Sequence, residues 1–159
     1  MYLAELLHEK GYDVFGLVAG QNNPKADLLR ITHPYVEIIS GNLLDLVSLI
    51  RAVAHAKPDE VYNLGAISFV AYSWENAQLT SDVTGKGVLN MLEAVRLHAG
   101  DDAGRIRFYQ ASSSEMFGKV QEVPQRESTL LWPRSPYGVA KVFGHYMTIN
   151  YRESYGMHA

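Results

Sequence analysis

The stretch RIRFYQASSSEMFG, residues 105–118, decides the fold, because it has the pattern of a buried strand that ends in a cluster of small polar residues. Three earlier stretches also have the pattern of strands, and helical spacings of apolar residues separate all four. Strands that alternate with helices predict an α/β fold with a parallel sheet and right-handed crossovers. The earlier strands are expected at 12–18, 35–40 and 60–65.

In a sheet of this kind, ligands bind at the carboxyl ends of the strands. The residues that follow each strand are therefore the first candidates for a functional site. These are residues 18–20, 41–45, 64–68 and 111–118.

Helix boundaries are also marked in the sequence. Asp45 is placed to cap a helix whose apolar face is Leu46, Leu49, Ile50 and Val53. A long helical stretch is expected after Gly65, and another from about Pro136 to Tyr155, where Gly156 stops it. Residues 20–27 are expected to form a loop, and residues 119–134 an irregular segment.

The composition restricts the class of protein. The chain has 159 residues, 47% of them hydrophobic, and a net charge of −3, which fits one globular domain. No run of Lys or Arg occurs, so neither nucleic acid nor an anionic membrane is expected as a partner. The absence of cysteine excludes disulfides and thiolate metal sites. The histidines are scattered, so no metal site is expected, and no apolar run or signal peptide is evident, so a cytoplasmic location is expected.

The stretch SPYGVAK, residues 135–141, carries the strongest chemical signal. Tyr137 and Lys141 are four apart, so a helix places both side chains on one face. A free phenol has a pKa near 10, and a nearby ammonium lowers it, which makes the phenolate available as a base. Such a base can take the proton of a sugar hydroxyl as hydride leaves the same carbon. The alternative is an amphipathic helix with a Tyr and a Lys by chance, and likewise Glu115 can belong to a plain polar turn.

Four motifs together resemble the extended short-chain dehydrogenase/reductase family of nucleotide-sugar enzymes, and within it the GDP-mannose 4,6-dehydratase branch. The resemblance implies a Rossmann-like, doubly wound parallel sheet and NADP as cofactor, with NAD not excluded. It also implies GDP-mannose or a related nucleotide sugar as substrate, and a homo-oligomer for the full-length parent protein. The motifs are YNLGA at 62–66, FYQASSSEMFGKVQEVPQ at 108–125, PRSPYGVAK at 133–141 and NYRESYGM at 150–157.

Carried over by position, the resemblance implies four catalytic residues. Tyr137 is the base for the C4 hydroxyl, and Lys141 tunes it and holds the nicotinamide ribose. Ser113 hydrogen-bonds the C4 oxygen, and Glu115 takes the C5 proton and helps water leave from C6. Cofactor-binding positions are Asn42, Leu43, Leu64, Gly65, Ala66 and Ser68, together with Tyr137 and Lys141.

The chain also departs from the family pattern. The first strand and its Gly-rich turn are missing before Met1, so residues 1–159 are expected to form a partial dinucleotide-binding domain without the substrate domain. The missing strand leaves a slot between 12–18 and 60–64, so these strands are expected to close up or the fold to be compromised. Cations that grip the 2′-phosphate of NADP are replaced by Ala19 and Gly20 in LVAGQNNPK.

Further replacements leave two other readings open. Ile67 and Phe69 stand where the family has Gln and His, and Leu79 replaces a tyrosine that lines the cofactor. One alternative is therefore another nucleotide-sugar epimerase or dehydratase of the same family. The other alternative is a non-catalytic fragment that does not bind the cofactor.

Overall fold

The computed structural model describes residues 2–20 and 23–159, with Lys25 described by its backbone alone. Met1, Gln21 and Asn22 lie outside the described residues, so the expectations for the start of the chain and for part of LVAGQNNPK are not addressed there. The strands are β1 (Val14–Val18), β2 (Val36–Ser40), β3 (Glu60–Asn63) and β4 (Arg107–Gln110). The helices are α1 (Tyr2–Glu9), α2 (Pro24–Thr32), α3 (Leu46–Ala56), α4 (Tyr72–Glu75), α5 (Ala77–Thr80), α6 (Gly87–Ala99) and α7 (Pro136–Tyr155).

The strands form two parallel pairs instead of one continuous sheet. β1 pairs with β2 from Val14 opposite Val36 onward, and β3 pairs with β4 from Glu60 opposite Arg107 to Asn63 opposite Gln110. No ladder joins β1 to β3 in the described part of the chain. The two flanking strands therefore do not close up over the expected slot.

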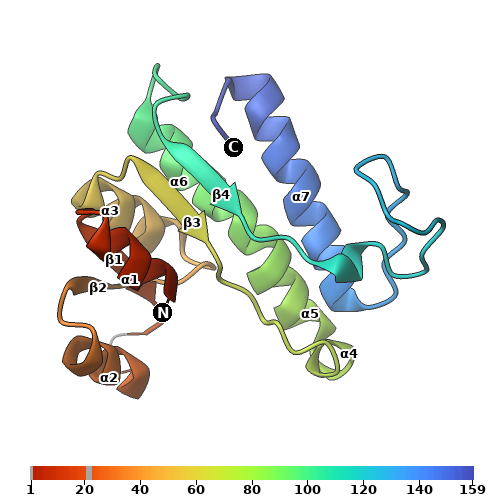
Figure 1. The fold of residues 1–159 in the computed structure, drawn as a ribbon, viewed down its shortest axis with the longest axis horizontal. Coiled ribbons are helices and arrows are strands. Elements are labelled where there is room, and N and C mark those ends of the chain that lie inside the picture. Colours follow the sequence, from red (N-terminus) through yellow and green to blue (C-terminus); the bar gives the residue numbers. More distant parts are fainter. Residues whose placement is uncertain (1, 21–22) are drawn as a thin grey trace.

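The helices pack mainly on one side of the strands. Figure 1 shows α6 passing behind β3 and β4, with α3 and α7 on either side of it, and α1 in front of β1. The hydrophobic core lies between α3, α6, β4 and α7, where Leu49, Leu92 and Ile106 are fully buried. By contrast, α1 contains no buried residue. The stable part of the molecule is thus the layer of α3, α6 and α7 against β3 and β4.

Local chemistry explains where the predicted helices begin and end. The Asp45 carboxylate accepts hydrogen bonds from Val47 N and Ser48 N and caps α3, as predicted. Ser135 caps α7 by accepting from Gly138 N, and α7 ends at Gly156, whose φ of 66° is left-handed. The predicted bounds of α7 are therefore confirmed.

Two expectations about the helices were wrong. Residues 20–27 are not all loop, because Pro24 begins α2 at a position where a missing N–H costs nothing. The long helix expected after Gly65 is interrupted: α4 and α5 are single turns, and a π-helical turn η1 (Ser81–Lys86) leads into α6. A short 3-10 turn η2 (Ser114–Met116) follows β4.

The end of the described chain begins to extend the second sheet. Phe108 N donates to His158 O at 2.8 Å, and Arg107 forms a parallel bridge with His158.

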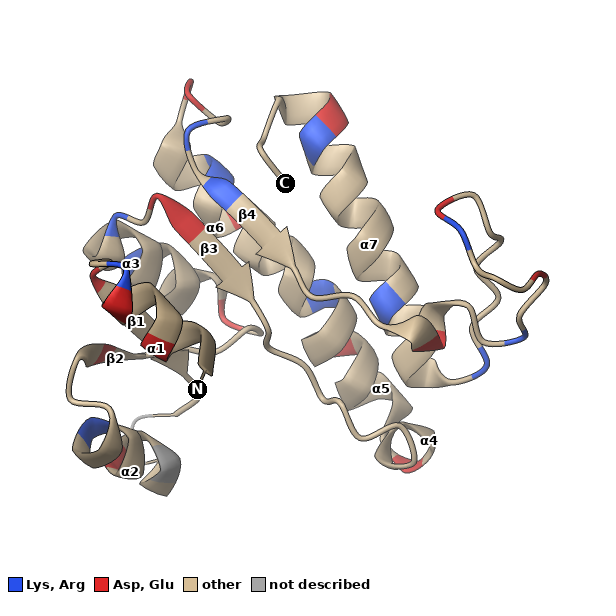
Figure 2. Ribbon diagram, in the orientation of Figure 1, with Lys and Arg blue, Asp and Glu red and all other residues tan. Residues whose placement is uncertain are grey.

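Charges of both signs are spread over helices and loops (Figure 2). No helix among the described residues is long and apolar enough to span a membrane.

Candidate functional site

The carboxyl ends of β2 and β3 meet in a first cluster, which holds most of the predicted cofactor-binding residues. Leu43 lies against Gly65 and Gly87: a Cβ added at either glycine would come within 2.8 Å or 2.9 Å of the Leu43 side chain. Asn90 Nδ2 donates to Leu43 O at 2.7 Å and fixes this loop on α6. The loop after β2 thus connects the two strand pairs at the edge where ligands bind in α/β sheets.

The loop after β3, residues 64–68, carries Leu64, Gly65, Ala66 and Ser68. Its backbone is held by Thr84, a buried residue of η1 whose hydroxyl accepts from Ile67 N at 3.0 Å. Leu64 and Phe69 are 58% and 69% exposed, so the outer edge of this loop is apolar and open. Leu64 and Phe69 thus give this edge of the loop two exposed apolar side chains.

Asn42 is held by the loop that follows β2. Its Oδ1 accepts from Leu44 N at 2.9 Å, and its backbone N–H donates to Ser48 Oγ at 3.0 Å. The amide oxygen retains a second lone pair, and the Nδ2 group remains a donor, so both ends of the Asn42 amide can still contact a ligand.

A second cluster forms where β4 ends and α7 begins. A loop at residues 111–113 leads from β4 to η2, which lies beside the first turn of α7 (Figure 1). Ser113 Oγ accepts from Glu115 N at 3.2 Å and caps η2. Gly138 allows α7 to approach this turn closely, because a Cβ there would lie 2.7 Å from Glu115 O. Ser113 and Glu115 are consequently held next to the Tyr137 end of α7.

Tyr137 and Lys141 lie on one face of α7, as the i, i+4 spacing predicted, and the structure shows that this face is buried. They are 7% and 5% exposed, and the Lys141 Nζ lies 5.7 Å from the centroid of the Tyr137 ring. Lys141 Nζ donates to Ala111 O at 2.8 Å. Burial lowers the pKa of the Lys141 ammonium below its ordinary value. A buried lysine with a single protein acceptor retains two N–H groups for a ligand hydroxyl.

Three apolar residues of α7 do not face the core. Val139, Phe143 and Tyr146 are 55%, 43% and 57% exposed, whereas Met147 packs against the core cluster. The buried face of α7 instead carries Tyr137, Ala140, Lys141, Gly144, Thr148 and Tyr151. Val139, Phe143 and Tyr146 therefore form a solvent-facing apolar stripe.

The two clusters are connected by side chains that sequence reasoning missed. Asn63 and Gln110 end β3 and β4 opposite each other, and Asn63 Nδ2 donates to Gln110 Oε1 at 2.8 Å. The available signal was an amide residue at the end of each of two predicted strands. The register that joins them could not be read from the sequence.

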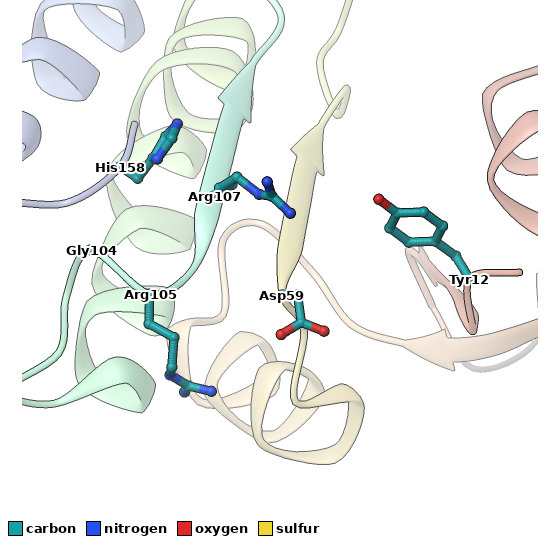
Figure 3. Close-up of a pocket in the computed structure, with 6 residues that line it drawn as sticks. All are labelled: Tyr12, Asp59, Gly104, Arg105, Arg107 and His158. Atoms are coloured by element: carbon teal, nitrogen blue, oxygen red, sulfur yellow. The ribbon is translucent and has the colours of Figure 1, made fainter. Parts of the chain in front are cut away.

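An open hollow lies at the opposite edge of the strands. It has a volume of about 490 Å³ and is lined by Tyr12, Asp59, Gly104, Arg105, Arg107 and His158 (Figure 3). All six residues are exposed, and the Arg107 guanidinium is already paired with Glu60 at 2.7 Å. This open hollow lies at the amino ends of β3 and β4, so it is separate from the two clusters. No group of three or more His, Asp or Glu side chains arranged for a metal occurs among the described residues.

The residues present fit part of a dinucleotide. The spare N–H groups of Lys141, beside Tyr137, suit a ribose hydroxyl, and the close approach at Gly65 leaves backbone exposed at the end of β3. A Gly-rich turn for the pyrophosphate does not occur in the described ranges 2–20 and 23–159. The fit is therefore to the nicotinamide-ribose half.

Comparison with known proteins agrees with this geometry. A sequence model of the family described as GDP-mannose 4,6 dehydratase matches residues 1–159. The GDP-mannose 4,6-dehydratase of Yersinia enterocolitica is 48% identical, over 99% of this chain and 44% of that protein. The human GDP-mannose 4,6 dehydratase is 42% identical over the same shares, and Arabidopsis thaliana GDP-mannose 4,6 dehydratase 1 is 46% identical over 99% and 46%. The chain spans less than half the length of these relatives.

Solved structures confirm the Rossmann-like, doubly wound fold. Thermus thermophilus UDP-glucose 4-epimerase, in complex with NAD, superposes with a TM-score of 0.77 at 28% identity, over 98% of this chain and 48% of that one. Thermotoga maritima UDP-glucose 4-epimerase with UDP-glucose gives 0.83 at 22% identity over the same shares. A dTDP-glucose 4,6-dehydratase of Streptomyces venezuelae with NAD and TYD bound gives 0.77 at 22% identity, again over 98% and 48%.

Proposed function

The chain belongs to the GDP-mannose 4,6-dehydratase family, and on that premise we propose that its protein converts GDP-mannose to GDP-4-keto-6-deoxymannose and water. The observation that supports this most strongly is the buried Tyr137–Lys141 pair, packed against the Ser113–Glu115 turn at the end of β4. In this proposal, residues 1–159 form part of the dinucleotide-binding domain of that enzyme.

The roles follow from the chemistry of each side chain. Tyr137, beside a cationic Lys141, takes the proton of the C4 hydroxyl. Ser113 donates to the C4 oxygen, and Glu115 removes the C5 proton and then protonates the C6 hydroxyl as it leaves. A nicotinamide cofactor held beside Tyr137 and Lys141 would supply both the hydride acceptor and the hydride donor, so the conversion would need no external oxidant or reductant.

NADP is the proposed cofactor, held by Lys141 and Tyr137 at the ribose and by the loops at 42–43 and 64–68. In the loop after β1, Ala19 O accepts from Asn23 Nδ2, and Gly20 O accepts from Ser40 Oγ at the end of β2. Neither Ala19 nor Gly20 supplies a cation for a 2′-phosphate. Fluorescence titration of the 159-residue chain with NADPH and, in parallel, NADH tests the preference. Tighter binding of NADH would overturn the NADP assignment.

The catalytic roles are tested in the full-length enzyme with GDP-mannose. Tyr137→Phe keeps the ring packed but removes the base, so turnover should fall by about 10²–10⁴-fold. Glu115→Gln should still oxidise C4, seen as a burst of reduced cofactor, but should release no 6-deoxy product. Normal product release by Glu115→Gln would contradict the elimination role, and near-normal turnover by Tyr137→Phe would contradict the base.

One observation favours a second reading, a chain that does not bind the cofactor by itself. The edges of β1 and β3 are unpaired in the described residues, so the cradle for a pyrophosphate is not assembled between them. A folded chain that binds neither NADPH nor NADH would support this reading for the 159 residues alone. That result would apply to the 159 residues alone and would not contradict activity of the full-length protein.

A homo-oligomer is the proposed assembly of the full-length protein. Val139 and Phe143 border a shallow hollow of about 310 Å³ between α7 and η1, and Asp82 and Lys86 line the same hollow. Across a two-fold axis, Asp82 of one copy can face Lys86 of the other while the two apolar stripes pack together. Phe143→Glu should therefore convert the assembly to smaller species in light scattering, whereas Tyr155→Glu, at the far end of α7, should not.

A further inference from the structure

A cross-strand pair of amides connects the two clusters of the candidate site. Asn63 and Gln110 are the last paired residues of β3 and β4. Asn63 is 5% exposed and Gln110 is half-buried, and the Asn63 Nδ2 to Gln110 Oε1 distance is 2.8 Å. Buried polar groups are costly unless they are hydrogen-bonded. The other hydrogen bonds that each amide makes therefore show which parts of the chain the pair holds in place.

On the β4 side, the pair meets the lysine of the site. Gln110 Nε2 donates to Ala111 O at 3.0 Å, and Lys141 Nζ donates to the same oxygen at 2.8 Å. Both lone pairs of the Ala111 carbonyl are thus occupied. The peptide itself is tied to β3, because Ala111 N donates to Asn63 O at 3.1 Å. Lys141 and Gln110 share one acceptor whose position depends on both strands.

On the β3 side, the pair meets the loop at 64–68. Asn63 Oδ1 accepts from Gly65 N at 3.4 Å, the longest bond of the series. A backbone N–H can only donate and a carbonyl can only accept, so the orientation of both amides is determined by their outer partners. The bonds run in one direction, from Gly65 N through Asn63 and Gln110 to Ala111 O.

We propose that the Asn63–Gln110 amide pair is a positioning element that fixes the Lys141 ammonium relative to the loop after β3. The role of Lys141 at the ribose rests on the proposed function. The positioning itself does not, because it concerns hydrogen bonds within this chain. Neither amide contacts a reacting atom, so both are positioning residues and not catalytic ones.

A purely structural role would give a different result. If the amides only filled space and satisfied each other, the neutral replacement Gln110→Met would change stability without affecting the pKa of Lys141. If they hold the acceptor of Lys141, replacing Gln110 must move the pKa of that lysine. Gln110 and Lys141 both lie within 3.0 Å of one oxygen, so a charge at position 110 acts on Lys141 at short range.

The test is a carbon-detected NMR titration of the 159-residue chain with ¹³C-labelled lysine, and it needs no cofactor. Loss of one signal in Lys141→Arg assigns the resonance. In Gln110→Glu the donor Nε2 becomes a carboxylate oxygen, so the pKa of Lys141 should rise by about one unit or more, a tenfold change in proton affinity. In Gln110→Met the donor disappears without a charge, and the Lys141 signal should shift with a smaller change of pKa.

Unaltered protein provides a second measurement if a variant fails to fold. Deprotonation of Lys141 should move the side-chain carbonyl carbons of Gln110 and Asn63, with the same midpoint as the lysine signal. The proposal is overturned if these carbons do not respond, or if folded Gln110→Glu leaves the pKa of Lys141 unchanged. Loss of turnover in Tyr137→Phe is independent of both measurements, so failure of the proposed function would be seen separately.

Discussion

Tyr151 is the residue whose removal best tests how α7 is held on the rest of the fold. Its hydroxyl donates to Glu93 Oε1 at 2.5 Å, which connects α7 to α6. Glu93 also accepts from Arg96 at 3.0 Å and 2.9 Å. Tyr151→Phe keeps the ring, which is 5% exposed, and removes one of the three hydrogen bonds that the carboxylate accepts. The expected loss in the free energy of unfolding is therefore the contribution of one hydrogen bond to a charged group.

Such a bond contributes about 1.5–3 kcal/mol to the free energy of unfolding. The Glu93 side chain is 24% exposed, so water partly replaces the lost donor and the lower end, about 1.5 kcal/mol, is expected. With a urea m-value of roughly 2 kcal/mol/M, the unfolding midpoint should fall by about 0.5–1 M. Tyr155→Phe is the matched control, because the Tyr155 ring lies 4.9 Å from Arg96 Cζ and its hydroxyl has no hydrogen bond among the described residues.

The effect should depend on pH in a defined direction. The hydrogen bond from Arg96, with a smaller contribution from Tyr151, lowers the pKa of Glu93 below its ordinary value. A carboxylate with a lowered folded pKa adds stability above its unfolded pKa and loses it as pH falls through the folded pKa. The difference in free energy of unfolding between the unaltered chain and Tyr151→Phe should therefore have its full value at pH 7 and become smaller below about pH 4. Equal midpoints for Tyr151→Phe and Tyr155→Phe at pH 7 would refute this reasoning.

Two further predictions concern α7 and its buried lysine. Ser135→Ala and Asp45→Ala each remove a helix cap, so each should lower the free energy of unfolding by about 1 kcal/mol in urea titrations. In the full-length enzyme only Ser135→Ala should also reduce turnover, because Ser135 caps the turn that carries Tyr137. Equal turnover losses would contradict that distinction. Lys141→Met should raise the free energy of unfolding at pH 7, because burial disfavours the charged ammonium and so lowers the pKa of Lys141 in the folded state. This cost is full below the folded pKa and is lost as the pH rises towards the unfolded value of about 10.4. The rise of stability with alkaline pH that Lys141 causes should disappear in this variant, and an unchanged pH profile would count against it.

The parts of the fold that local chemistry determines could be predicted from the sequence. α7 is the clearest case, since its cap Ser135, its first residue Pro136 and its stop Gly156 are all within or next to the helix. The interrupted helix between Gly65 and Gly87 was not predictable in this way. Its π-helical turn is packed against α7, a contact between residues more than fifty positions apart.

The candidate site was predictable in its residues and less so in its surroundings. The spacing of Tyr137 and Lys141 placed both on one face, but composition alone would bury Val139 and Phe143 and expose a lysine. The structure does the reverse, because Lys141 finds a carbonyl acceptor at Ala111, thirty residues away. Burial of that ammonium depends on where β4 ends, and hydrophobic patterning does not contain this information.

The unpaired edges of β1 and β3 determine how the two clusters of the site are held together. Parallel strands are normally buried on both faces, yet Phe15 and Leu17 of β1 remain 36% and 37% exposed. Tyr12, whose hydroxyl donates to Glu60 Oε1 at 3.3 Å, bridges the strand pairs near their amino ends. At the carboxyl ends the connection is made by Leu43, packed on Gly65 and bonded to α6. The geometry of the first cluster therefore depends on helix packing, whereas Asn63 and Gln110 place the second cluster by direct pairing of β3 with β4.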